Sequence, residues 1–294
     1  MPDEELIDKQ FMDRLAQLTL TARKIFRGKI KGERLSRKRG QSIEFADYRN
    51  YVVGDDLRFI DWNIYGRLDR LFLKLFLEEE DLFVYILIDT SESMSYGAPS
   101  KLLYAKRIAA ALGYIGLANL DRVVLSAFSS GIGSALTPGR GKRQARKLFG
   151  YLETLTCDGE TSLENSIRLF TARHRQPGMV IVLSDFLDPA GFESALKRLR
   201  GRNMDIYAFH ILADEEVDPP LVGDLRLVDA EDGSQVEITM SGPMIKGYKN
   251  AVQNFCDDLN RFCTKSGMSY VFSKSSDPFD RLILNYLRRR GLVK

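Results

Sequence analysis

The sequence predicts an α/β protein with a Rossmann-like, doubly wound and mostly parallel sheet. Two apolar runs, residues 83–88 and 179–183, contain no charged side chain, which is typical of strands buried on both faces of a parallel sheet. An aspartate follows each run, Asp89 directly and Asp185 after one serine. Amphipathic helical stretches alternate with apolar strands along the rest of the chain, and this alternation indicates βα units.

The first 80 residues are expected to form an N-terminal helical and irregular region with one strand. Residues 6–30 place apolar side chains at intervals of three to five, which predicts an amphipathic helix. Residues 44–67 are densely charged without periodicity, and we interpret them as an irregular segment that paired charges hold on the main domain. Residues 71–79 are predicted as a strand that a tight turn joins to the strand at 82–88.

Residues 81–294 are expected to form the main domain. Its other strands are predicted at 121–128, 132–136, 204–211 and 268–272. Its helices are predicted at 99–119, 142–155, 162–174, 189–201, 244–266 and, at the C-terminus, 278–290. The segment 213–242 breaks this alternation, because it carries two short β runs, 225–228 and 236–239, around a Glu-Asp-Gly turn. It therefore predicts an inserted β-hairpin.

Composition narrows the class of protein. A hydrophobic content of 44% and a charged content of 28% over 294 residues describe an ordinary globular protein. Three cysteines without metal-site spacing indicate a reducing compartment. The N-terminus is acidic, unlike a signal peptide, and the longest apolar helical stretch, 108–120, is shorter than the roughly 20 residues that span a bilayer. We therefore expect a cytoplasmic protein without a membrane span.

Oxygen-bearing side chains gather where one edge of the sheet is predicted. Asp89, Ser91 and Ser93 follow the first buried strand, Asp185 follows the second, and Thr161 stands at the start of a predicted helix. If the two strands flank the switch point of a doubly wound sheet, their loops converge on one crevice. Carboxylates and hydroxyls suit Mg²⁺, Mn²⁺ or Ca²⁺ better than zinc. These five side chains, partly acting through water, would leave a position open for an outside ligand.

Two other interpretations use the same residues. Ser91, Ser93 and Thr161 are good helix N-caps, so they could cap helices while Asp185 stabilises a turn. Alternatively, Asp89 could be the nucleophile of a metal-dependent phosphohydrolase, as in haloacid-dehalogenase-like phosphatases. Those enzymes need a second acid two residues further on, where this chain has Ser91. The chain has no P-loop and no Gly-x-Gly-x-x-Gly motif, so ATP binding by either device is not expected.

A further alternative is a nucleic-acid-binding module. The segment 23–39 contains nine Lys or Arg residues and a single acid, which favours a phosphate-rich partner. Its only aromatic residue is Phe26, and this scarcity argues against stacking on single strands. With a net charge of only +3, nucleic acid is the less favoured partner.

The order Asp89-x-Ser91-x-Ser93, Thr161, Asp185 resembles the metal-ion-dependent adhesion site of von Willebrand factor A domains. Further motifs resemble the bacterial family called domain of unknown function 58. They are EFADYR at 44–49, GDDLRFIDW at 54–62 and LSDF at 183–186. The similarity extends from about residue 20 to 290, and the predicted hairpin also resembles an insertion seen in this family.

This resemblance implies a von Willebrand factor A-like domain in which an acidic residue of a protein partner completes the metal coordination. Family members commonly appear beside AAA+ ATPases of the MoxR type, which implies an adaptor or chaperone-like assembly role with such an ATPase. We therefore expect a non-enzymatic, metal-dependent protein-binding module. Phosphoester hydrolysis and nucleic-acid binding remain the alternatives.

Overall fold

The computed structural model describes residues 7–20, 43–78, 82–137, 139–219, 223–228, 235–287 and 292–293. The chain divides into two compact units, Ile25–Asp81 and a larger one made of Met1–Lys24 with Leu82–Lys294. The larger unit thus takes in the N-terminal segment, which the sequence had suggested would belong to a region 1–80. The basic segment 23–39 and the turn before the strand at 82–88 lie outside the described residues.

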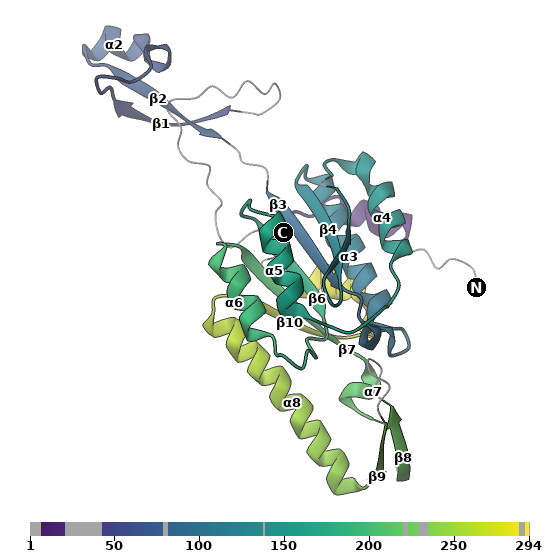
Figure 1. Ribbon diagram of the computed structural model, residues 1–294. Helices are drawn as coiled ribbons and strands as arrows, with labels where there is room; N and C mark the ends of the chain where they lie inside the picture. The colour runs from purple at the N-terminus through teal and green to yellow at the C-terminus, as the bar shows by residue number, and fades with distance from the viewer. Residues whose placement is uncertain are drawn as a thin grey trace. The chain divides into compact units, whose positions relative to one another are not determined.

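The larger unit is built on a six-stranded sheet with the strand order β10-β7-β6-β3-β4-β5 (Figure 1). Its strands are β3 (Phe83–Asp89), β4 (Arg122–Phe128), β5 (Ile132–Ala135), β6 (Met179–Ser184), β7 (Asp205–Leu212) and β10 (Ser269–Lys274). Only β5 runs antiparallel to its neighbour. The predicted fold class, α/β with a doubly wound and mostly parallel sheet, is therefore confirmed.

The two charge-free runs are neighbours at the centre of this sheet. Ile86 of β3 pairs with Ile181 of β6 in parallel register, and every residue from Val84 to Ile88 is buried. Gly178, just before β6, passes so close to the carbonyl oxygen of Phe83 that a Cβ atom there would clash with it. The chain reverses its order of strand addition between β3 and β6, which makes this boundary the switch point where crevices form.

Helices cover both faces of the sheet and bury two separate hydrophobic clusters. One face carries α1 (Lys9–Leu15), α3 (Lys101–Ala118) and α4 (Ala145–Thr154), and the other carries α5 (Leu163–Arg173), α6 (Glu193–Gly201) and α8 (Gly242–Lys265). Short 3₁₀ turns lie at Glu92–Ser95 and Lys142–Gln144. Within the described ranges, no helix combines the length and the apolar character needed to cross a membrane.

The two terminal helices differ from the prediction. Instead of a helix over 6–30, α1 ends at Leu15, and Leu20 forms an antiparallel bridge with Val293. The chain leaves the helix because Leu18 and Leu20 are buried in an extended stretch, where Asn119 donates a hydrogen bond to the Leu18 carbonyl over 2.7 Å. Near the C-terminus, α9 (Phe279–Arg281) passes directly into a π-helical turn, Leu282–Tyr286.

The predicted hairpin is present as β8 (Gly223–Val228) and β9 (Gln235–Met240), which pair antiparallel. A four-residue helix that the sequence had not predicted, α7 (Asp214–Val217), lies between β7 and the hairpin. The first residues of α8 follow β9 and are mostly exposed, since this end of the helix extends past the sheet toward the hairpin (Figure 1).

The smaller unit has its own two-stranded sheet, formed by β1 (Ile43–Asn50) and β2 (Phe72–Glu78). Between them lie a 3₁₀ turn, Leu57–Phe59, and α2 (Trp62–Leu68). The sequence predicted β2 but joined it to the main sheet, and it missed β1. The structure corrects both points, because β2 pairs with β1 and not with the main sheet. The strand β1 was missed because its charged residues interrupt the alternation of apolar and polar residues that marks a strand.

Paired charges do hold this segment together, but the pairs join residues of the smaller unit. The Arg49 guanidinium contacts both carboxylate oxygens of Asp55 at 2.7 Å. Asp61 accepts hydrogen bonds from the backbone nitrogens at the start of α2, from the Tyr48 hydroxyl at 3.0 Å and from Lys74 at 3.1 Å. These ion pairs and hydrogen bonds therefore stabilise the local fold of the smaller unit.

Candidate metal centre

Four of the five predicted ligands meet at the ends of β3 and β6. The Ser91 hydroxyl donates to Asp89 Oδ1 over 2.8 Å and lies 3.1 Å from the Ser93 hydroxyl. Ser93 in turn donates to Asp185 Oδ2 over 2.8 Å. Each hydroxyl thus donates its proton to a different carboxylate, and the 3.1 Å contact between the two hydroxyl oxygens brings both carboxylates into one polar cluster, as expected from loops that converge at a switch point.

Thr161, the fifth predicted ligand, is half-buried in the segment between α4 and α5. Two backbone hydrogen bonds fasten this segment to the Asp89 loop: Glu92 N donates to the Gly159 carbonyl over 2.9 Å, and Asp158 N donates to the Thr90 carbonyl over 2.8 Å. The structure therefore brings the segment that carries Thr161 beside the loop that carries Asp89, Ser91 and Ser93.

Asp89 lies in an environment that opposes its negative charge. Its side chain is fully buried, and this burial, together with the nearby charge of Asp185, raises its pKa to about 7. Hydrogen bonds oppose that rise, among them one of 2.6 Å from the Ser184 hydroxyl to Asp89 Oδ2. A cation bound at this carboxylate would favour its ionised form.

The hydroxyls of Ser91 and Ser93 do not serve as helix caps. Ser91 precedes the 3₁₀ turn Glu92–Ser95, but its side chain makes no capping hydrogen bond there. The residue that precedes α5 is Ser162, not Thr161, and the Leu163 nitrogen donates instead to Asp188 over 2.7 Å. The capping interpretation is therefore wrong for Ser91 and Ser93, whose hydroxyls face the carboxylates.

Three residues of this centre were not predicted from the sequence. Ser184 contacts Asp89, while the Lys101 ammonium lies 2.7 Å from Asp185 Oδ2 and 2.6 Å from Glu216 Oε1. A signal for Lys101 existed, because helical spacing puts it on the apolar face of the helix predicted at 99–119. Nothing pointed to Glu216, which lies on α7, the short helix that had not been predicted.

Lys101 is completely buried at the first position of α3. Burial acts to lower the pKa of its ammonium, but the charges of Asp185 and Glu216 outweigh that effect, and the pKa is raised. The ammonium therefore keeps its positive charge inside the protein.

The loop after β6 holds an uncommon backbone conformation. Phe186, directly after Asp185, has a φ of 57°, which is rare for a bulky residue. Its nitrogen donates to the Ser184 hydroxyl over 2.9 Å, and its ring is buried. Such strain persists only where the surroundings enforce it and is typical of functional sites. Here it turns the chain so that Ser184 and Asp185 both face the Asp89 loop.

The donors at this centre fit a hard divalent cation. Carboxylate and hydroxyl oxygens are the ligands that Mg²⁺ and Ca²⁺ prefer. Asp185 and Glu216 contact the ammonium of Lys101, and Asp89 lies near enough to Asp185 for their charges to interact. When these three carboxylates are ionised, one divalent ion would balance the charge that the ammonium leaves uncompensated. Within the part of the chain that is described, no three His, Cys, Asp or Glu side chains form a group suited to a metal. The hydroxyls are thus essential to the assignment.

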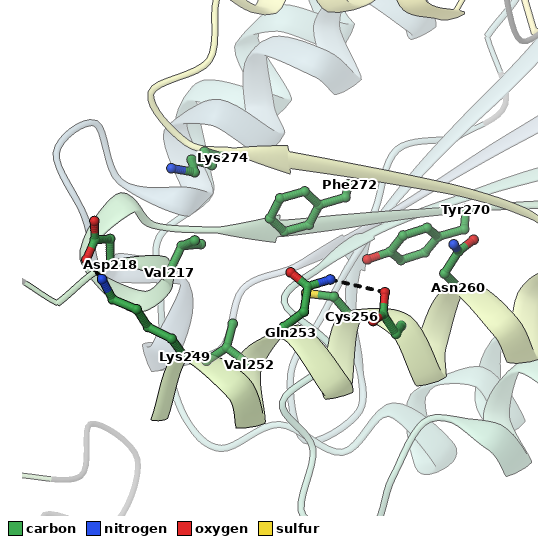
Figure 2. Close-up of a pocket in the computed structure, with 11 residues that line it drawn as sticks. Val217, Asp218, Lys249, Val252, Gln253, Cys256, Asn260, Tyr270, Phe272 and Lys274 are labelled. Atoms are coloured by element: carbon green, nitrogen blue, oxygen red, sulfur yellow. Dashed lines mark hydrogen bonds and ion pairs between the residues drawn. The ribbon is translucent and has the colours of Figure 1, made fainter. Parts of the chain in front are cut away.

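A separate cavity of about 470 Å³ lies between α8 and β10 (Figure 2). Tyr270 and Phe272 of β10 form one wall, and Lys249 and Gln253 of α8 form the other, next to Asp218. None of the five predicted ligands lines it. The candidate metal centre is therefore distinct from this cavity.

Comparison with known proteins places the chain in a family. The model for "Protein of unknown function DUF58" matches residues 47–255. An uncharacterized protein from Mycobacterium tuberculosis is 23% identical over 297 residues, which cover 98% of this chain and 93% of the relative. The crystal structure of the conserved hypothetical protein BatB from Bacteroides thetaiotaomicron is similar over 71% of this chain and 98% of its own, with 18% identity and a TM-score of 0.46.

The von Willebrand factor A domain of SpRpn10 is similar over 70% of this chain and 95% of its own, with 14% identity and a TM-score of 0.38. The family match covers well over half of the chain and includes the loops of Asp89, Thr161 and Asp185. The chain belongs to the DUF58 family of proteins of unknown function.

Proposed function

We propose that this protein is a non-enzymatic module that binds a protein partner through a divalent cation. Asp89, Ser91, Ser93, Thr161 and Asp185 would hold Mg²⁺, Mn²⁺ or Ca²⁺, and a Glu or Asp side chain of the partner would supply a further ligand. The observation that carries this proposal is the polar cluster in which Ser91 donates to Asp89, Ser93 donates to Asp185, and the two hydroxyl oxygens lie 3.1 Å apart.

The chemistry of the donors supports binding over catalysis. Mg²⁺ keeps an octahedral shell and usually retains several waters, so a side chain from outside can replace one of them. Asp89, the residue that a phosphohydrolase would use as its nucleophile, accepts hydrogen bonds at both oxygens, from Ser91 and Ser184. In that position it is held as a fixed acceptor and is poorly placed to attack a substrate.

We further propose that the partner is an AAA+ ATPase of the MoxR type, and that the protein acts as an adaptor or chaperone-like assembly factor. Membership in the family supports this proposal, because the resemblance to that family implies an association with such ATPases. The partner acid would approach the centre near Ser93, which is partly exposed, whereas Asp89 and Asp185 are buried.

Calorimetric titration of Mg²⁺, Mn²⁺ and Ca²⁺ into the full chain tests the metal site. We expect saturable binding that Asp89→Asn removes, because this substitution deletes a charge and keeps the shape of the side chain. Ser126→Ala is the matched control, since Ser126 is a buried serine of the same sheet, one strand away. Binding that survives Asp89→Asn would contradict the proposed ligand set.

The partner is tested separately by titrating a MoxR-type ATPase into the protein with metal and with EDTA. The proposal predicts an interaction that EDTA abolishes and Asp185→Asn weakens. An interaction of equal strength with EDTA would show that the ATPase binds elsewhere and would exclude a metal bridge.

A further inference from the structure

Lys101 places a permanent positive charge where the metal site is expected. Its ammonium lies 2.7 Å from Asp185 Oδ2, the same oxygen that accepts a hydrogen bond from Ser93. No part of its side chain is exposed. A divalent cation bound through this oxygen would therefore share it with an ammonium group, and one bound through Oδ1 would still lie on the carboxylate that Lys101 contacts.

Glu216 offers the same ammonium a second carboxylate. Its Oε1 lies 2.6 Å from Lys101 Nζ, while its Oε2 accepts a hydrogen bond from the Ala213 nitrogen over 2.7 Å. The Tyr248 hydroxyl of α8 donates to the Glu216 carbonyl over 2.9 Å. Glu216 is thus held by two hydrogen bonds besides its ion pair with Lys101.

We propose that Lys101 is an internal cation that competes with the divalent ion for Asp185, and that Glu216 limits this competition by holding the ammonium. This inference rests on the proposed function, because it concerns the metal site itself. It assigns Lys101 and Glu216 as positioning residues that set the metal affinity without binding the metal.

The physical reason is repulsion between like charges at close range with little solvent between them. Asp185 is buried, so little water screens the repulsion between the Lys101 ammonium and a divalent ion bound at the same carboxylate. Metal entry would weaken the bond between Lys101 and Asp185 and leave the ammonium to Glu216. The site would then bind divalent ions more weakly than its oxygens would without Lys101. A partner carboxylate that coordinates the ion would therefore raise the metal affinity further from this lower starting value.

Calorimetry on three variants tests this proposal. Lys101→Met keeps the length of the side chain and removes its charge, so we expect the metal dissociation constant to fall at least about tenfold. Lys106→Met is the matched control, because it removes a lysine from the same helix whose ammonium binds the Leu155 carbonyl instead of the site carboxylates. We expect that control to stay within about twofold of the wild type.

Glu216→Gln is measured both alone and together with Lys101→Met. Alone, it should weaken metal binding, because Lys101 then has only Asp185 as a charged partner. If Glu216 acts through Lys101, the effect of Glu216→Gln must shrink when Lys101 is already absent. An equal effect in both backgrounds would overturn the role of Glu216. The double variant also removes one of the two acids, Asp185 and Glu216, that Lys101→Met leaves without their cation and that could prevent that variant from folding.

The outcomes separate this inference from the proposed function. Tighter binding in Lys101→Met, or binding that appears only in that variant, supports competition. Unchanged or weaker binding in Lys101→Met, with wild-type binding that Asp89→Asn still abolishes, overturns the inference and leaves the metal site in place. No binding in either protein overturns both. Thermal unfolding gives an independent readout, since Lys101→Met should gain more thermal stability from added metal than the wild type does.

Discussion

The ammonium of Lys101 forms a 2.7 Å ion pair with Asp185 in which neither side chain is exposed by more than 1%. The pair connects the first turn of α3 to the loop after β6, so it joins a helix and a strand that are far apart in the chain. It also sets the electrostatics of the candidate metal centre, because its charges are shielded from water.

We expect that breaking this pair from the acidic side destabilises the fold. Asp185→Asn should lower the free energy of unfolding by about 3 kcal/mol, near the low end for a broken buried pair because Glu216 remains beside the ammonium. Arg198→Met, which breaks the exposed pair with Glu164, should cost less than about 1 kcal/mol. Urea unfolding of both variants in EDTA checks the difference, and equal costs would contradict it.

Two buried serines of the main sheet are predicted to respond differently to alanine. Ser184 donates to Asp89 over 2.6 Å and accepts from the Phe186 nitrogen, so Ser184→Ala should cost about 2 kcal/mol through the loss of a bond to a charged group. The Ser126 hydroxyl has no hydrogen-bond partner among the described residues, so Ser126→Ala should be close to neutral. Chemical denaturation measures both, and a neutral Ser184→Ala would argue against the contact with Asp89.

Glycine is required where β6 begins beside β3. Because a Cβ atom at Gly178 would clash with the Phe83 carbonyl, we expect Gly178→Ala to destabilise the protein by about 2 kcal/mol through overpacking. Gly150 lies in α4 with open space at the Cβ position, and Gly150→Ala should stabilise by about 0.5–1 kcal/mol. Shifts of the thermal midpoint in opposite directions would confirm this, and a harmless Gly178→Ala would contradict the close approach.

The proposal of a binding module also predicts what the protein does not catalyse. With Mg²⁺ or Mn²⁺ present, the wild type should hydrolyse p-nitrophenyl phosphate no faster than Asp89→Asn, since Asp89 is held by two serines. A continuous absorbance assay measures the rates. A metal-dependent rate in the wild type that Asp89→Asn removes would favour the phosphohydrolase alternative.

Much of the main unit was predictable from local patterns. Charge-free runs identify β3 and β6 because a strand buried on both faces cannot carry exposed charge. The polar residues at the ends of those strands predicted a shared site, since parallel strands of a doubly wound sheet bring their carboxyl ends together. The hydrogen bonds among Asp89, Ser91, Ser93 and Asp185 agree with that expectation.

The smaller unit shows where local patterns fail. The stretch Asp47–Tyr48–Arg49 reads as charged and irregular, yet it lies within β1 and pairs with β2. Its charges are accommodated by partners such as Asp55 for Arg49, which lie several residues away in a turn. Alternation does not reveal this strand, because Asp47, Tyr48 and Asn50 are exposed and burial does not require apolar residues at alternate positions there.

The sequence by itself determined the six strands of the main sheet, the acids that follow its central strands and the hydroxyls that accompany them, because these depend on neighbours within a few residues. It did not determine that β2 belongs to a separate sheet. Only the tertiary structure decided that Lys101 and Glu216, 115 residues apart in the chain, form an ion pair. The same ammonium also contacts Asp185. A lysine buried on an apolar helix face destabilises the fold unless acidic partners lie beside it, and the sequence does not show which acids those are. Those partners come from the end of β6 and from α7, and the folding of the sheet alone brings them together.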